Sequence, residues 1–294
     1  MNKFHGTGVA LVTPFNTDGS VAFNKLQKLI DHTINGGVDY LVSLGTTGET
    51  ATLSIIERTE VWNFTSEAVA GRIPLVAGVG GNNTSELTQQ VKNMNGNQFD
   101  AILSVSPYYN KPTQEGIYQH YKAVSEASDL PLILYNVPGR TGSNIASETT
   151  LRLAHDFKNI IGIKEASGDF DQFNKIMKDK PADFLFISGD DPIALQMISM
   201  GAVGIISVIG NAFPSILSKM IQMCLDGNFS EARFSHYSLI EVTRHIFAEG
   251  NPAGVKATLK LLGICGDTVR LPLVNITEET FESIAQELNK LNLI

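Results

Sequence analysis

The chain has 294 residues, of which 43% are apolar and 18% charged, a composition typical of folded globular proteins and unlike disordered or collagen-like chains. Its 22 basic and 30 acidic residues give a net charge of −8. The basic residues are scattered along the sequence, which disfavours binding to nucleic acid or to an anionic membrane surface.

The two cysteines, Cys224 and Cys265, belong to no CxxC or zinc-like pattern. The sequence therefore predicts neither a disulfide framework nor a structural metal site, and a reducing cytoplasmic location fits. The first residues lack the apolar core of a signal peptide, and Asn211 and Pro214 interrupt the long uncharged stretch 192–218. We expect no export signal and no membrane-spanning segment.

Short, apolar, β-rich runs recur along the chain at intervals of about 30 residues, the length of a strand–helix–strand unit. Most are continuously apolar, which is typical of parallel strands covered on both faces. Eight strands are expected, at residues 7–13, 40–44, 74–79, 101–106, 131–136, 160–164, 184–188 and 202–208.

The segments between these runs have helical periodicity. The Asp191-Pro192 pair predicts a helix start, with the Asp191 carboxylate as the cap and Pro192 in the first helical turn. Eight strands alternating with helices predict a (β/α)8 barrel, also called a TIM barrel. An open doubly wound sheet is the alternative, but residues 13–16, after the first strand, lack its glycine-rich phosphate loop.

Beyond residue 225 the strand pattern stops, and residues 229–247, 255–262 and 278–293 have the pattern of amphipathic helices. No flexible linker separates them from the preceding chain. We therefore expect a catalytic barrel over residues 1–225 and a helical C-terminal region over residues 226–294 that packs on the barrel.

Catalytic groups of such barrels lie where the strands end, and Lys164 follows the apolar run 160–163. An amine that is kept from water is more readily neutral and can attack a carbonyl carbon to form a Schiff base. The alternative is an ion pair with Glu165 or Asp190. The six histidines contain no HExxH pair, so we expect no metal site.

Other polar side chains follow neighbouring strands. Tyr135, Tyr109 and Thr46 could relay protons through their hydroxyl groups, and Arg140 could hold a carboxylate through two parallel hydrogen bonds. The alternatives are tyrosines with their hydroxyls in water, a structural turn around Thr46, and a surface ion pair between Arg140 and Glu148.

Four segments, GTTGE at 45–49, YYNKPT at 108–113, YNVPGRTG at 135–142 and GIKEASGD at 162–169, together resemble the dihydrodipicolinate synthase family. The resemblance covers essentially the whole chain. That family belongs to the pyruvate-dependent Schiff-base aldolases, the N-acetylneuraminate lyase superfamily, which have a (β/α)8 barrel and a helical C-terminal region.

The resemblance implies a lyase that condenses pyruvate with L-aspartate 4-semialdehyde to 4-hydroxytetrahydrodipicolinate, the committed step toward diaminopimelate and lysine. It implies no cofactor beyond the Schiff base between pyruvate and the protein. The implied roles are Schiff-base formation for Lys164; proton relay for Thr46, Tyr135 and, in a neighbouring subunit's site, Tyr109; pyruvate carboxylate binding for Thr47; aldehyde carboxylate binding for Arg140; and pocket lining by the backbones of Gly189 and Ile206.

Two alternatives stay open at this point. Sister enzymes, N-acetylneuraminate lyase and the 2-keto-3-deoxy sugar-acid lyases, resemble this chain in the GxTGE segment and the lysine strand, whereas Arg140 and the Tyr108–Tyr109 pair favour the synthase. The second alternative is a pyruvate-binding protein without turnover, and the presence of every relay residue disfavours it.

Family members that lysine inhibits bind it at a subunit interface. Ile55 and Arg58 stand where such members have histidine, and a cationic Arg58 would repel the lysine ammonium or pair with Glu86. We therefore expect weakened or altered inhibition. The family is usually a homotetramer, a dimer of dimers, with some dimeric members. The positions of this chain that match the lysine site are Thr50, Ala51, Asn82, Glu86 and Tyr108.

Overall fold

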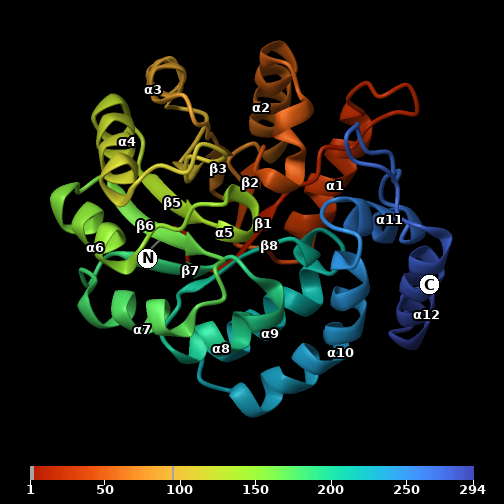
Figure 1. Ribbon diagram of the computed structural model, residues 1–294. Helices are drawn as coiled ribbons and strands as arrows, with labels where there is room; N and C mark the ends of the chain where they lie inside the picture. Colours follow the sequence, from red (N-terminus) through yellow and green to blue (C-terminus); the bar gives the residue numbers. More distant parts are fainter. Residues whose placement is uncertain (1–2, 95) are drawn as a thin grey trace.

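The computed structural model describes residues 3–94 and 96–294 of the chain. Its centre is a closed barrel of eight parallel strands in chain order, with β8 pairing β1 (Figure 1). The predicted (β/α)8 fold is confirmed. The strands are β1 (Gly6–Ala10), β2 (Tyr40–Ser43), β3 (Leu75–Gly78), β4 (Ala101–Val105), β5 (Leu132–Asn136), β6 (Ile160–Glu165), β7 (Leu185–Ser188) and β8 (Gly204–Ser207).

Helices surround the strands, and short 3₁₀ turns follow β2, β7 and β8. The turns are η1 (Thr46–Gly48), η2 (Thr50–Thr52), η3 (Asp191–Ile193) and η4 (Ile209–Asn211). The helices are α1 (Phe23–Asn35), α2 (Ile55–Val69), α3 (Thr84–Lys92), α4 (Gln114–Ala127), α5 (Pro138–Thr141), α6 (Ser147–Asp156), α7 (Phe170–Asp179), α8 (Ala194–Ser199), α9 (Pro214–Leu225), α10 (Phe229–Phe247), α11 (Ala253–Leu261) and α12 (Glu278–Lys290).

Successive side chains of each strand alternate between the barrel interior and the helical layer, as the two-residue period of a strand requires. Ile133 and Tyr135 belong to the interior cluster, whereas Leu134 packs in the cluster shared with the helices. On β6, Lys164 pairs in register with Tyr135, and Glu165 pairs with Asn136. The register therefore directs Lys164 into the barrel and the adjacent Glu165 toward the helices.

Two local predictions are wrong. The expected strand 7–13 ends at Ala10, because the Val12 N–H donates to Asn211 Oδ1 (3.1 Å) instead of to a neighbouring strand. Asp191 does not cap the helix that follows it, since its carboxylate accepts hydrogen bonds from Ser207 Oγ and, at 2.9 Å, from the Val208 N–H.

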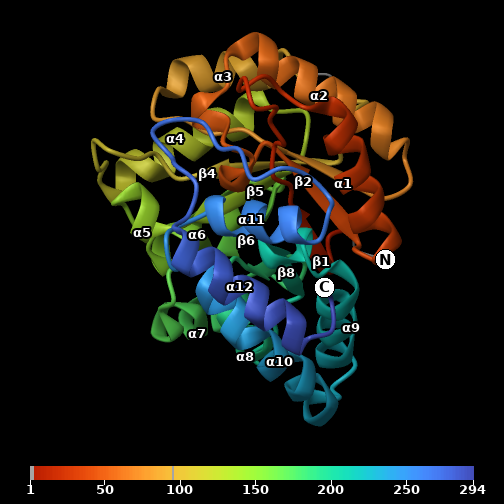
Figure 2. The ribbon, with the colours of Figure 1, turned by 90° about the vertical axis from the view of Figure 1, so that its right-hand side faces the viewer.

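Helices α10, α11 and α12 pack against one another beside the barrel (Figure 2), and α10 also contacts α8 and α9. They agree closely with the three helices expected after residue 225, whereas the division into two units at that residue stays a prediction. No helix within the described residues combines the length and the hydropathy needed to cross a lipid bilayer.

A buried ion pair joins this helical region to the barrel. Lys256 of α11 and Glu49, which follows η1, are both fully shielded from solvent, and their charged groups are in contact. The Lys256 ammonium also donates to the Thr268 carbonyl (2.8 Å) and lies 4.2 Å from the centre of the Phe15 ring. Burial lowers the pKa of Lys256, and the charge of Glu49 opposes that shift.

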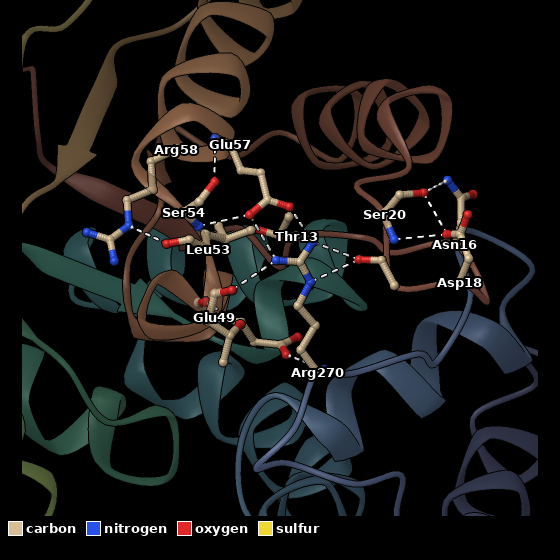
Figure 3. A network of polar contacts seen from close by, with 12 residues as sticks. Thr13, Asn16, Asp18, Ser20, Glu49, Leu53, Ser54, Glu57, Arg58 and Arg270 are labelled. Atoms are coloured by element: carbon tan, nitrogen blue, oxygen red, sulfur yellow. Dashed lines mark hydrogen bonds and ion pairs between the residues drawn. The ribbon is translucent and has the colours of Figure 1, made fainter.

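Arg270 extends the same network at the surface (Figure 3). Its backbone N–H donates to Glu49 Oε2 (2.9 Å), and its guanidinium pairs with Glu57 at the start of α2. The guanidinium also donates to the carbonyls of Thr52 and Gly19, at 2.9 and 2.7 Å. The segment after α11 is thus tied to the loop after β2 through charged groups.

We expect Lys256→Met to lower the free energy of unfolding by about 3–5 kcal/mol, because it leaves the Glu49 carboxylate buried without its counter-charge. The double variant Glu49→Gln/Lys256→Met is expected to recover part of that loss. Urea unfolding of the purified variants measures both. Lys260→Met is the matched control, since its ion pair with Asp267 leaves half of the lysine side chain exposed and such pairs contribute about 0–1 kcal/mol. Equal losses in the two single variants would contradict the expectation.

Candidate active site

Two cavities open where the strands end. The larger, of about 680 Å³, is lined by Lys164, Thr47, Gly189 and Asp190 together with residues of α10. The smaller, of about 430 Å³, is lined by the loop after β2, by Tyr108 and by Pro272 and Leu273. Both cavities share one wall, which consists of Thr46, Tyr135, Val137, Arg140 and Asn251.

Lys164 lies near the end of β6 and is 4% exposed. Its ammonium is 4.3 Å from the centre of the Tyr135 ring. Within the described residues it forms neither of the ion pairs considered as alternatives, with Glu165 or with Asp190. Gly189 makes room for it, because a Cβ at that position would lie 3.0 Å from Lys164 Cε.

Glu165 is engaged on the opposite side of β6. Its carboxylate accepts hydrogen bonds from Asn136 Nδ2 (3.0 Å), the Ser167 N–H (2.8 Å) and Gln172 Nε2 (2.9 Å). Burial raises the pKa of Glu165, and these hydrogen bonds offset part of the shift. They hold the end of β6 and thereby the backbone that carries Lys164.

Asp191 connects the loops after β7 and β8. Besides Ser207 and Val208, it accepts a hydrogen bond from the Ile209 N–H (3.3 Å). Burial raises the pKa of Asp191, while its hydrogen bonds and the nearby charge of Lys164 lower it. Across residues 3–94 and 96–294, no group of three or more His, Cys, Asp or Glu side chains is placed to hold a metal ion.

Thr46 and Thr47 form the turn η1 after β2. Thr46 is exposed toward both cavities, whereas Thr47 is 2% exposed and accepts a hydrogen bond from Asn251 Nδ2 (2.9 Å). Sequence reasoning missed Asn251. The Gly-Asn-Pro segment at 250–252 marks only a break between helices, and nothing in it points to a contact 204 positions away.

The remaining predicted site residues differ in placement. Arg140, on α5, is exposed, lines both cavities and forms no ion pair with Glu148 within the described residues. Tyr109 is 87% exposed and lines neither cavity. Ile206 is buried in the barrel interior and is not part of either cavity wall, where its neighbour Val208 lies instead.

The positions that match the lysine site are only partly brought together. Thr50, Ala51 and Tyr108 line the smaller cavity, as does Arg58. Asn82 and Glu86 do not line it, although Asn82 Nδ2 donates to the Tyr108 carbonyl (3.1 Å).

Arg58 does not pair with Glu86 within the described residues; its Nε donates to the Leu53 carbonyl (3.0 Å), as Figure 3 shows. Ile55, which also stands at a histidine position, is 80% exposed at the start of α2.

A closed barrel with a buried lysine facing a cavity at the carboxyl ends of its strands has the architecture of a (β/α)8-barrel enzyme. The model of the dihydrodipicolinate synthetase family matches residues 3–291, and the chain belongs to that family. It is 55% identical to the 4-hydroxy-tetrahydrodipicolinate synthase of Flavobacterium psychrophilum over 95% of both chains. It is 51% identical to the synthase of Parabacteroides distasonis over 98% of this chain and 97% of that one.

Solved structures agree. The dihydrodipicolinate synthase of Thermotoga maritima superposes with a TM-score of 0.96 at 39% identity, covering 100% of both chains. The enzyme of Cyanidioschyzon merolae, solved with lysine bound, has a TM-score of 0.95 at 38% identity over 100% of both chains. The chloride-inhibited enzyme of Acinetobacter baumannii, solved with pyruvate, has a TM-score of 0.95 at 39% identity over 99% of both chains.

The raised pKa of Glu165 predicts the direction of a pH effect on stability. A carboxyl group whose pKa is higher in the folded than in the unfolded state stabilises the fold most below its unfolded pKa, and that contribution is lost as pH rises through the folded value. As pH rises above the ordinary pKa of a glutamate, about 4.3, we expect wild type to lose unfolding free energy relative to Glu165→Gln, which has no carboxyl group to titrate. Chemical denaturation across this range measures the difference. A constant difference, or one that grows in favour of wild type, would contradict the assignment.

Proposed function

We propose that Lys164 attacks the carbonyl carbon of pyruvate and forms a Schiff base with release of water. Loss of a methyl proton gives an enamine, whose carbon adds to the aldehyde of L-aspartate 4-semialdehyde while the aldehyde oxygen takes up a proton. The amine of that substrate then attacks the Schiff-base carbon, and this one C–N bond both closes the ring and releases the Lys164 amine, giving 4-hydroxytetrahydrodipicolinate. The chain is a lyase of its family, and its reaction leads toward diaminopimelate and lysine.

The observation that carries this proposal is the environment of Lys164. The side chain is buried, faces the larger cavity, and has no carboxylate partner within ion-pair distance among the described residues. An amine that opens onto a cavity and is not held in an ion pair is sterically available as the nucleophile that Schiff-base formation requires. The covalent adduct on Lys164 takes the place of a separate cofactor.

The second substrate must be held by its carboxylate, and we assign this role to Arg140. A guanidinium binds a carboxylate through two parallel hydrogen bonds, and Arg140 lines both cavities without an ion-pair partner among the described residues. The curated relatives are named as synthases, which supports this reaction over that of the sister lyases and over a non-catalytic pyruvate binder.

Thr46 and Tyr135 share a cavity wall with Arg140, and we assign the proton relay to their hydroxyl groups. Tyr109 completes the relay only if it comes from a second copy, since in its own chain it points to solvent. The surface around the smaller cavity supports such assembly, because Tyr109, Ile55, Ile56 and Leu271 are large, apolar or aromatic and exposed.

We propose a dimer as the smallest active unit and a homotetramer, a dimer of dimers, as the assembly. A cytoplasmic location fits the two free, buried cysteines, Cys224 and Cys265.

Lys164→Ala is expected to abolish turnover of pyruvate with L-aspartate 4-semialdehyde, because no other lysine among the described residues lines either cavity. Turnover is followed by coupling to the next reductase and reading NADPH oxidation. Borohydride reduction in the presence of pyruvate, followed by peptide mass spectrometry, is expected to label the Lys164 peptide in wild type only. Lys260→Ala, an exposed lysine on α11, controls for non-specific loss. Turnover that persists in Lys164→Ala would refute the proposed mechanism.

The smaller cavity predicts weak inhibition by lysine. Arg58 adds a positive charge to the wall of this cavity, and it would repel the ammonium groups of a lysine bound there. We expect wild type to need substantially more lysine for half-inhibition than Arg58→His does. Lysine titrations of the coupled assay compare the two, with Arg72→His, which lines neither cavity, as the control. Strong inhibition of wild type at low lysine concentration would overturn the expectation.

A further inference from the structure

Asn251 stands out as a buried polar side chain with unused hydrogen-bonding capacity inside the site. It is 8% exposed and lies between α10 and α11, in the helical region that follows the barrel. Its Oδ1 is buried and has no hydrogen-bond partner among the described residues, although the side chain lines both cavities. Leaving a buried carbonyl oxygen unpaired is unfavourable, which points to a partner supplied by a bound ligand.

The other end of the same amide determines what Thr47 can do. Asn251 Nδ2 donates to Thr47 Oγ1 (2.9 Å), so one lone pair of that hydroxyl is occupied and its own hydrogen remains available. No acceptor within the described part of the chain takes this hydrogen, and Thr47 lines the cavity that holds Lys164. The hydroxyl hydrogen is therefore available for donation to a ligand in that cavity.

We propose that Asn251 recognises both substrates: its N–H orients the Thr47 hydroxyl toward the carboxylate of the keto acid, and its Oδ1 accepts a hydrogen bond from the amino group of the aldehyde substrate. The proposal rests on the function proposed above and deepens it. Arg140 and Asn251 belong to the same wall, so an amino acid that binds Arg140 through its carboxylate brings its adjacent amino group toward this wall.

This arrangement also suits the step in which the amine displaces Lys164. An amine that donates one N–H to Oδ1 keeps its lone pair free for attack on the Schiff-base carbon. Asn251 then acts in two ways, as a positioning residue for Thr47 and as a direct contact that favours an aldehyde carrying an amino group over one without it.

Two substitutions separate these roles. Asn251→Leu keeps the approximate shape and removes both polar groups, so we expect the pyruvate concentration for half-maximal borohydride-trapped adduct to rise about tenfold or more. We also expect the variant to distinguish L-aspartate 4-semialdehyde from succinate semialdehyde, which lacks the amine, about tenfold less well than wild type does. The comparison uses kcat/KM for L-aspartate 4-semialdehyde and the competitive inhibition constant for succinate semialdehyde.

Asn251→Asp gives a further, pH-dependent signature. An ionised carboxylate can only accept, so it takes the Thr47 hydrogen and adds a negative charge near the pyruvate carboxylate. We expect weaker pyruvate binding than in Asn251→Leu, with partial recovery as pH falls and the carboxyl group regains a donor. A purely structural role for Asn251 would give no such recovery.

Thr258→Ala is the matched control, because Thr258 is buried on α11, donates to the Gly254 carbonyl (2.9 Å) and lines neither cavity. Unchanged pyruvate dependence and unchanged discrimination in Asn251→Leu would overturn the proposal, as would lowered stability alone. If Asn251→Leu fails to fold, the pH profile of Asn251→Asp decides. Absence of the Lys164 adduct in wild type would instead contradict the proposed function.

Discussion

The ion pair between Lys256 and Glu49 is the interaction on which the geometry of the site depends most. Two charges are removed from water, a costly arrangement that persists only when the partners and their remaining hydrogen bonds are well placed. Glu49 follows directly on the turn η1, and its carboxylate is held from one side by Lys256 and from the other by the Arg270 backbone. The helical region therefore fixes the turn that carries Thr46 and Thr47. It is part of the site rather than a covering added to it.

A second constraint is the two-residue period of β6. Lys164 and Glu165 are adjacent in sequence, yet the register sends one into the barrel and the other into the helical layer. Asn136, Ser167 and Gln172 satisfy Glu165 there, so the carboxylate that is nearest in sequence is not available to neutralise Lys164. A shift of one residue in this strand would exchange the two side chains and remove the amine from the cavity.

These two constraints explain what could be predicted from the sequence. The barrel, the order of its strands and the position of Lys164 follow from local signals, namely apolar runs at regular spacing and a charged residue at the end of one of them. Asn251 and Lys256 gave no such signal, because their partners Thr47 and Glu49 lie 204 and 207 positions away. Asp191 was misassigned for the same reason: its partners on β8 and the following loop outweighed the local Asp-Pro pattern.

Tyr109 combines an unusual backbone conformation with an almost fully exposed side chain. Its backbone lies in the left-handed region, with φ of 73°, which an aromatic residue adopts only when its surroundings compensate for the strain. Within one chain the Tyr109 side chain is almost fully exposed. Its backbone N–H donates a hydrogen bond to the Thr141 carbonyl (3.3 Å). The Thr141 backbone belongs to the same short helix as Arg140. An association that buries Tyr109 would therefore act on the helix that carries Arg140, and it would couple assembly to the carboxylate binding proposed for that residue.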